Sequence, residues 1–281
     1  MRVLFTGASS PIGSRVLEEM LKASSCAEVW CARHKHEMQT PDPRLRVIEL
    51  DLTSDRGLQT IPQSIDVVVH FAGVTHSRDA EQYWNVNYRG TVRLAEAARA
   101  KGCRRFVYVS TRCATAGAGA YGESKLAAEN ELKKLDWESL LIIRPAEIYG
   151  AGGTEGIDRL ISMSQRWHVT PALLGSSKIG FAPLHIDDFA RLASEPIAKA
   201  KNDQVIVEVC GPEDLSGPAL GWRLVKHFRT FPIPVWWPLV ALLVRAGLNL
   251  GVPDQVQRLT CIKTATAKRA NAIGETRFFC S

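Results

Sequence analysis

A tyrosine and a lysine four residues apart, Tyr121 and Lys125, have the types and spacing to handle a proton. Helix-forming residues follow them, so the two side chains are predicted to share one face of a helix. A phenol has a reference pKa of about 10, and a neighbouring ammonium favours its ionised form. The pair could therefore serve as a general acid–base near neutral pH. The same spacing also fits an exposed helix start, so the assignment depends on the elements that would position the pair.

The first of these elements is a strand, a glycine turn and a helix at the N-terminus. Residues 2–6 form a short apolar run, and a helical pattern follows Gly13. Gly7 permits a tight turn, and Gly13 lets the helix approach the strand closely. The helix N-terminus offers amides to a pyrophosphate, as a dinucleotide cradle requires. Ser10 stands where the middle glycine of that fingerprint is expected, which predicts a looser approach of the backbone to the phosphates.

Further apolar runs predict strands over 28–32, 46–50, 66–70, 105–109 and 140–143, and a long helix over 79–100. Alternating strands and helices predict an α/β fold, a Rossmann-like doubly wound parallel sheet with helices on both faces. The alternation ends near residue 150. We therefore expect a dinucleotide-binding domain over 1–150 and a smaller C-terminal substrate-binding lobe over 151–281, with part of 182–210 packing back on the first domain.

The ends of the predicted strands carry the candidate ligand contacts. The second strand ends in Ala32-Arg33-His34-Lys35, with no acid for a ribose hydroxyl. This composition suits a 2′-phosphate and favours NADP(H) over NAD(H), although an exposed basic turn has the same composition. Asp51 and Leu52 follow the third predicted strand, where they could contact the edge of an adenine ring. The small residues Ala72 and Gly73 would let the backbone pass close beneath a cofactor.

Several polar residues favour structural roles. His70 is expected to pack at the end of a strand, and the Asn87 side chain is expected to hydrogen-bond the backbone. Asp187 and Asp188 resemble a carboxylate pair, but no His or Cys has ligand spacing around them, so helix capping is favoured over a metal site. We expect no metal.

Composition narrows the class of protein. A net charge of +6 suits an anionic ligand, but the cations are scattered, which argues against nucleic acid. Seven cysteines without paired spacing indicate free thiols in a reducing compartment, and Met1–Phe5 runs directly into a glycine turn, unlike a signal peptide. We expect a cytoplasmic protein. The apolar helix predicted over 235–250 is too short to span a bilayer; it could pack on the lobe or form a membrane-surface face.

In combination these motifs resemble the extended short-chain dehydrogenase/reductase family, on its nucleotide-sugar epimerase/dehydratase branch. The similarity covers roughly residues 1–200 in family order. The motifs that carry it are Thr6-Gly7 to Ile12-Gly13, Asp51-Leu52, His70-Phe71-Ala72-Gly73, Asn87, Ser110-Thr111, Tyr121 with Lys125, Arg144-Pro145 to Tyr149-Gly150, and 184–188.

The resemblance implies roles for individual residues. Tyr121 would be the catalytic acid–base, Lys125 its pKa partner and ribose ligand, and Thr111 the hydroxyl that orients the reacting oxygen. Thr111, Glu147 and Arg159 would contact substrate. The residues implied in cofactor binding are Gly7, Ser9, Ser10, Ile12, Gly13, Arg33, Asp51, Leu52, Phe71, Ala72, Gly73, Asn87, Ser110, Tyr121, Lys125, Pro145 and Ile148, the last two flanking the nicotinamide.

The implied activity is hydride transfer at a carbinol or ketone of a nucleotide-diphosphate sugar, as a 4-epimerase or a 4-ketoreductase. Arg144 and Arg159 lie where the chain enters the second lobe and suit a dianionic ligand. Two departures bear on the substrate: nine residues separate Thr111 from Tyr121, where this branch often has more than twenty, and Glu147 replaces a frequent Asn.

Other functions stay open. A non-catalytic NAD(P)-binding subunit is one, although such relatives commonly lack the Tyr/Lys pair. A reductase of a lipid-linked or hydrophobic ketone is another, because the short loop leaves the cleft open. A homodimer and a peripheral membrane contact through 235–250 also stay open.

Overall fold

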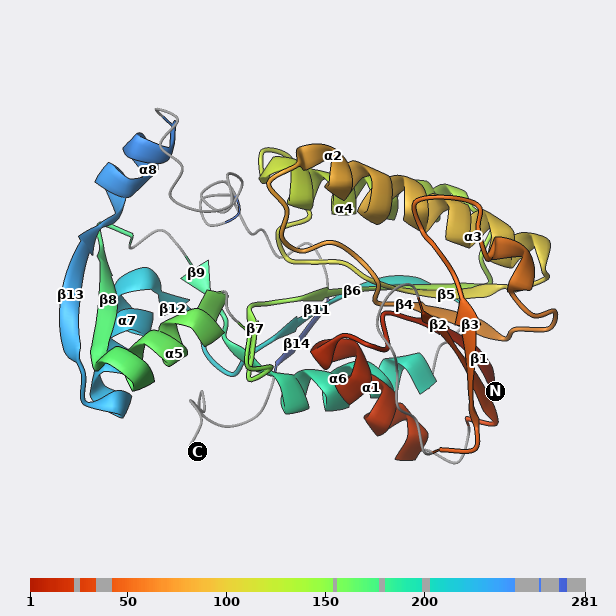
Figure 1. Cartoon of the computed structure of the whole chain (residues 1–281), viewed down its shortest axis with the longest axis horizontal. Coiled ribbons are helices and arrows are strands. Elements are labelled where there is room, and N and C mark those ends of the chain that lie inside the picture. The colour runs from red at the N-terminus through yellow and green to blue at the C-terminus, as the bar shows by residue number, and fades with distance from the viewer. Residues whose placement is uncertain are drawn as a thin grey trace.

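A parallel eight-stranded sheet forms the centre of the molecule (Figure 1), with the strand order β14-β11-β6-β5-β4-β1-β2-β3. The computed structural model describes residues 1–22, 26–33, 42–153, 156–176, 180–198, 203–245, 258 and 268–271. The strands are β1 (Arg2–Thr6), β2 (Glu28–Arg33), β3 (Leu45–Glu49), β4 (Val67–His70), β5 (Arg105–Val109), β6 (Ser139–Pro145), β11 (Gln204–Cys210) and β14 (Lys268–Asn271). The order 3-2-1-4-5-6 is that of a dinucleotide-binding sheet, with its switch point between β1 and β4.

Helices cover both faces of this sheet, as the alternating pattern predicts. α1 (Pro11–Lys22) and α6 (Ile186–Ala198) lie on one face, and α3 (Thr91–Ala100) and α4 (Gly119–Lys134) on the other (Figure 1). Every residue of β4 is buried, because both of its faces are covered. A short turn of helix, η1 (Leu58–Thr60), precedes β4.

The helix predicted over 79–100 is present but not uniform. It consists of α2 (Ala80–Gln82), the π-helical segment η2 (Tyr83–Gly90) and α3. Asp79 caps its start by accepting a hydrogen bond from the Glu81 amide at 2.9 Å. A π-segment inserts an extra residue per turn and rotates the side chains that follow it, and Asn87 lies within it.

The second lobe has its own small core. It contains β7 (Ile148–Tyr149), α5 (Gly156–Trp167), β8 (Val169–Leu174), β9 (Gly180–Phe181), β10 (Leu184–His185), β12 (Leu215–Ser216), α7 (Gly217–Phe228), β13 (Phe231–Trp236) and α8 (Trp237–Arg245). Its buried apolar side chains are Tyr149, Ile157, Ile161, Phe181, Leu215, Leu220 and Leu224. The helix predicted over 235–250 is wrong at its start, because Val235 and Trp236 end β13, which pairs with β8. Residues 246–250 lie outside the described residues.

After residue 150 the chain returns to the large sheet. β11 joins the large sheet beside β6, and β14 adds the outermost strand beside β11. α6 packs on the same face as α1 (Figure 1). The segments 186–198, 204–210 and 268–271 therefore belong with the large sheet although they follow the start of the lobe.

No helix among the described residues is long and apolar enough to cross a membrane. Cys26, Cys31, Cys103, Cys113 and Cys210 carry free thiols. Burial raises the pKa of the Cys31 thiol to about 12, so it is held neutral as a core residue.

Candidate active site

The glycine turn after β1 is as tight as the sequence predicts. A side chain at Gly7 would meet the Ala72 amide nitrogen at 2.7 Å, and one at Gly13 would meet the Gly7 carbonyl oxygen at 2.1 Å. Gly7 also has a φ of 80°, in the left-handed region. Ser10 closes the turn: its hydroxyl donates to the Gly7 carbonyl at 2.8 Å and accepts from the Gly13 amide at 3.0 Å. The substitution for glycine therefore braces the loop through its side chain.

The end of β4 faces this turn across the switch point. Ala72 donates its amide to the Thr6 hydroxyl at 3.2 Å, and Phe71 stacks on Phe5 with ring centroids 5.2 Å apart. His70 is buried between Thr6 and Thr91, within 2.6 and 2.9 Å of their hydroxyls, in the packing role predicted for it. Burial lowers the pKa of His70 to about 3, which keeps the ring neutral.

Gly73 has no side chain, and this leaves space for a flat ligand beside Asn87 and Lys125. A methyl group there would lie 2.9 Å from the Asn87 carboxamide oxygen and 3.2 Å from Lys125 Nζ. Asn87 is buried and bonds both polar groups of Val74, accepting from its amide at 2.7 Å and donating to its carbonyl at 2.8 Å. The backbone bonding expected of Asn87 is thus present, and it fixes the strand end beside Gly73. These glycines and this fixed edge fit a dinucleotide.

Tyr121 and Thr111 meet at the start of α4. The Thr111 side chain hydrogen-bonds the Tyr121 hydroxyl, and Thr111 also accepts from the Cys113 amide at 3.2 Å. Burial raises the pKa of Tyr121, while Arg258 and the hydrogen bond from Thr111 act to lower it. The two hydroxyls predicted to touch the reacting oxygen are therefore brought together.

Lys125 lies one turn further along α4 and is fixed in place. Its ammonium donates to the Val109 carbonyl at 3.0 Å and lies 4.8 Å from the centre of the Tyr108 ring. Burial lowers the pKa of Lys125 to about 8, partly opposed by the charge of Glu129. Lys125 thus sits between the sheet edge and Gly73, where a ribose ligand is predicted.

Arg258 is a site residue that the sequence analysis missed. Its guanidinium carbon lies 3.9 Å from the centre of the Tyr121 ring and 5.4 Å from that of Tyr83. It donates to the Thr75 carbonyl at 2.8 Å and to the Tyr83 hydroxyl at 2.9 Å. The cation stacked on Tyr121 is therefore Arg258 rather than Lys125. A lone Arg far along the chain in a weakly patterned segment carries no sequence signal for this placement.

Arg144 does not serve the ligand role suggested for it. It is buried and forms a bidentate ion pair with Glu129 at 2.9 and 2.6 Å. Ser110, predicted to bind cofactor, donates its hydroxyl to the same carboxylate at 2.5 Å. These three residues instead tie α4 to β5 and β6 beneath the site.

The adenosine end of the predicted cradle lies at β2 and β3. Arg33 pairs with Glu49 at 3.3 Å and stays partly exposed. His34 and Lys35 lie outside the described residues. Asp51 turns back on Thr53, accepting from its amide at 2.8 Å and its hydroxyl at 2.7 Å, while Leu52 is buried.

The remaining predicted contacts are placed as follows. Ser9 is exposed on the glycine turn, and Ile12 packs from α1 against the core. Pro145 ends β6, and Ile148 opens β7 opposite Leu184. Arg159 is exposed on α5.

Glu147 reaches toward the second lobe. Its carboxylate accepts from the Ala182 amide at 2.8 Å and lies 3.6 Å from Arg112. The Glu147 carboxylate therefore already has a cation and an amide beside it, which reduces the repulsion that its negative charge would exert on a diphosphate.

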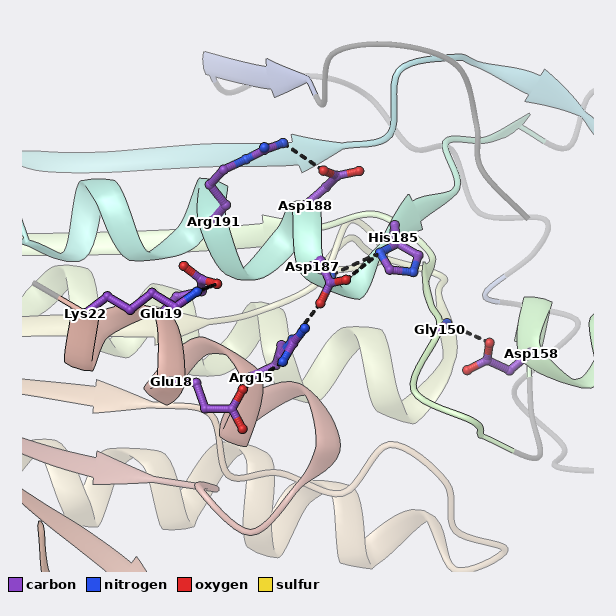
Figure 2. A network of polar contacts seen from close by, with 10 residues as sticks. All are labelled: Arg15, Glu18, Glu19, Lys22, Gly150, Asp158, His185, Asp187, Asp188 and Arg191. Carbon is purple, nitrogen blue, oxygen red and sulfur yellow. Dashed lines mark hydrogen bonds and ion pairs between the residues drawn. The ribbon is translucent and has the colours of Figure 1, made fainter. Parts of the chain in front are cut away.

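The acidic pair at the start of α6 forms ion pairs. Figure 2 shows Asp187 turned toward Arg15 of α1, at 2.5 Å, and Asp188 turned toward Arg191, at 2.7 Å. Both acids lie in the first turn, where negative charge is favourable. Asp158 of α5 instead accepts the Gly150 amide (Figure 2) and also the amides of Ala151 and Gly153. No cluster of metal-ligating side chains occurs among the described residues.

Comparison with known proteins agrees with this geometry. The family model described as NAD dependent epimerase/dehydratase family matches residues 3–210. The chain is 27% identical to UDP-glucose 4-epimerase from Vibrio cholerae over 288 aligned residues, which cover 92% of this chain and 85% of the epimerase. It is 31% identical over 188 residues to ceramide reductase from Caulobacter vibrioides, covering 67% of this chain and 58% of the reductase.

Solved structures share the fold. MoeE5 in complex with UDP-glucose and NAD superposes with a TM-score of 0.70 at 23% identity, covering 84% of this chain and 85% of that one. DesIV, a dTDP-glucose 4,6-dehydratase from Streptomyces venezuelae, gives a TM-score of 0.70 at 21% identity, covering 84% of both chains. At these identities the likeness establishes the architecture.

Proposed function

The chain belongs to the NAD dependent epimerase/dehydratase family, and from this premise we propose that it performs hydride transfer at a carbinol or ketone carbon of a nucleotide-diphosphate sugar. The observation that carries the proposal is the hydrogen-bonded pair Thr111 and Tyr121 at the carboxyl edge of the sheet, beside Lys125 and Gly73. Open parallel sheets place their ligands at this edge.

The cofactor contacts follow from the same edge. Gly7, Ser10 and Gly13 would hold the pyrophosphate, with the glycine turn held by Ser10. Asn87 and Lys125 border the space beside Gly73, where the nicotinamide ribose would lie. When bound, the nicotinamide supplies or accepts the hydride at the sugar carbon.

The protein's part in the reaction is to hold the oxygen and move its proton. Thr111 orients the reacting oxygen, and Tyr121 donates a proton to it in reduction or removes one in oxidation. Lys125, fixed on the Val109 carbonyl, would bind the ribose and add positive charge to the site. Arg258 favours the phenolate of Tyr121 by its stacked charge.

The nucleotide-sugar substrate is supported by the alignment with the UDP-glucose 4-epimerase, because that alignment extends through the second lobe. A preference for NADP(H), supported by Arg33, would favour a ketoreductase that releases its product over an epimerase that retains its cofactor.

A second candidate is reduction of a hydrophobic ketone. It is supported by the similarity to ceramide reductase and by the exposed apolar side chains Trp236 and Leu242 of the second lobe. The short segment between Thr111 and Tyr121 is also consistent with a bulkier substrate.

Thermal unfolding with NADP(H) and a panel of UDP-, dTDP- and GDP-sugars separates the two candidates. A ligand at 100 times its Kd adds about 2.7 kcal/mol of stability, which raises the midpoint visibly. We expect a shift with at least one nucleotide sugar, retained in Tyr121→Phe. No shift with any nucleotide sugar, together with NADPH oxidation by a long-chain ketone, would replace the first proposal with the second.

A further inference from the structure

The second lobe carries apolar side chains that nothing among the described residues covers. They follow one another along β13 and α8: Phe231, Ile233, Trp236, Leu239 and Leu242, called here the lobe patch. Phe231 is 80% exposed, Leu242 62% and Trp236 61%. β13 and α8 form the end of the molecule farthest from β3 (Figure 1). Monomeric proteins rarely expose apolar residues in such a run without a binding role.

α8 is fixed at its base, so its apolar side chains are presented outward. Pro238 packs against Gly175, where an added methyl group would meet its ring carbon at 2.9 Å, and Trp237 packs on the lobe core. Trp236, Leu239 and Leu242 recur at a spacing of three residues and remain exposed. The lobe does not use these side chains for its own core.

The surroundings of the lobe patch are cationic. Residues 215–253 contain four Lys or Arg and no Asp or Glu, a net charge of +4. Arg223 of this stretch is paired with Glu213, whereas Lys226 and Arg229 are exposed just before Phe231. Arg166 and Trp167 are exposed at the end of α5, and the next residue, His168, accepts a hydrogen bond from the Phe231 amide at 2.9 Å. Exposed cations and aromatic rings therefore meet at the start of β13.

We propose that the lobe patch and its flanking cations dock the protein on an anionic membrane surface. Aromatic and aliphatic side chains insert at the headgroup level, while Arg166, Lys226 and Arg229 attract lipid phosphates. A second copy of the chain fits this surface less well, because symmetric pairing would bring the same cations together without a carboxylate from 215–253. This docking does not depend on which substrate the active site takes.

Sedimentation with vesicles of phosphatidylcholine, with and without phosphatidylglycerol, tests the proposal on the full chain. We expect binding to the anionic vesicles that is abolished in Trp236→Ser/Leu242→Ser and kept in Val47→Ser, a control on exposed β3. Arg166→Gln/Lys226→Gln should weaken binding about 25-fold, at about fivefold per cation. The exposed control pair Arg104→Gln/Lys134→Gln should bind like the wild type.

A second measurement avoids reliance on destabilising changes. Brominated lipids should quench tryptophan emission of the wild type, and Trp236→Phe should reduce the quenched fraction. Absence of binding to any vesicle, or binding unchanged in the Trp236→Ser/Leu242→Ser variant, would overturn the proposal. So would a wild-type dimer in sedimentation velocity that this variant dissociates, because the lobe patch would then be a contact between copies.

Discussion

Two positively charged side chains bear on Tyr121, and they are held differently. Lys125 is fixed on the Val109 carbonyl, one turn along the same helix. Arg258 comes from the far end of the chain and stacks directly on the Tyr121 ring. Because burial by itself raises the pKa of Tyr121, the hydroxyl depends on its neighbours to titrate at a useful pH.

Removing only the hydroxyl tests the role of Tyr121. We expect Tyr121→Phe to lower kcat by about 10²–10⁴-fold, the contribution of a general acid–base, while cofactor affinity and thermal midpoint stay near wild type. Steady-state kinetics and cofactor titration measure both. Tyr88→Phe, at a half-buried tyrosine of η2, serves as the control. A wild-type rate in Tyr121→Phe would remove the assignment.

Arg258 should control the pH profile. Loss of its charge removes a cause that lowers the pKa of Tyr121, so in Arg258→Gln the pKa rises. The midpoint governed by Tyr121 should therefore move to higher pH in both reaction directions, because oxidation needs the phenolate and reduction needs the phenol. Arg258→Lys should restore part of the shift, and the exposed Arg78→Gln none. An unchanged midpoint in Arg258→Gln would show that the arginine acts only on binding.

Cofactor choice is expected to depend on Arg33. Its guanidinium is shared with Glu49 and stays partly exposed at the end of β2. A charge-assisted bond to a 2′-phosphate contributes about 1.5–3 kcal/mol, so Arg33→Ala should weaken NADP(H) binding about tenfold or more and leave NAD(H) unchanged. Fluorescence titration of both cofactors measures this, with Arg46→Ala on β3 as the control. Equal loss for both cofactors would contradict the role.

At the scale of elements, the sequence predicted the parts whose signal is local. The buried runs that became β1, β4 and β5 and the glycine turn after β1 need only their own residues and immediate neighbours to be recognised. β13 was misassigned because its apolar residues Val235 and Trp236 continue into α8 without a break in hydrophobicity. The π-segment η2 was not predicted, because its extra residue per turn leaves no compositional mark.

The same distinction applies to the site. Tyr121, Lys125 and Thr111 lie within one short stretch, so their spacing could be read directly. The ion pair of Arg144 with Glu129 could not be predicted, because the sequence does not fix the orientation of the helix that carries Glu129. Arg144 was therefore assigned to a ligand. Arg258 was missed because it lies 137 residues from Tyr121 in the sequence, and no local pattern links the two.

The ion pair beneath the site should be structural. Glu129 and Arg144 are buried and form a bidentate pair, so Arg144→Leu leaves the Glu129 carboxylate buried without its bidentate partner and should lower the free energy of unfolding by about 3–5 kcal/mol. Glu129→Leu/Arg144→Leu should recover much of this loss, because no charge remains buried. Denaturant unfolding of the full cycle measures the coupling.

The exposed pair Lys134 and Glu131 is the control for this cycle, and Lys134→Ala should unfold like the wild type. Additive losses in the double variant would show that the two buried residues act independently.

At the scale of the whole molecule, the segment by which the chain enters the second lobe is held by contacts within that lobe. β7 pairs with β10, and Tyr149 packs edge-on against His185 with ring centroids 5.5 Å apart. Asp158 gathers three amides of the connection at 150–153. These contacts therefore fix the segment that follows β6.

Glu147 lies where the chain enters the second lobe. It could serve the stability of the fold or the binding of substrate, and substitution of Glu147 distinguishes the two roles. If the carboxylate mainly neutralises Arg112 and accepts from the Ala182 amide, the Gln side chain of Glu147→Gln can still accept that hydrogen bond. The largely buried Arg112 then loses its counter-charge. We expect Glu147→Gln to lower the free energy of unfolding by about 2–3 kcal/mol, and Arg112→Met to couple to it in a double-variant cycle.

If Glu147 instead contacts substrate, as the resemblance implies, the same change should raise KM and leave the unfolding midpoint unchanged. Denaturant unfolding and steady-state kinetics on Glu147→Gln therefore distinguish the two roles. Arg56→Met, which removes a mostly exposed partner of Glu49, is the control and should alter neither quantity. Since Glu147 accepts a hydrogen bond from the Ala182 amide, a loss of stability would show that this contact holds the 180–184 segment in place.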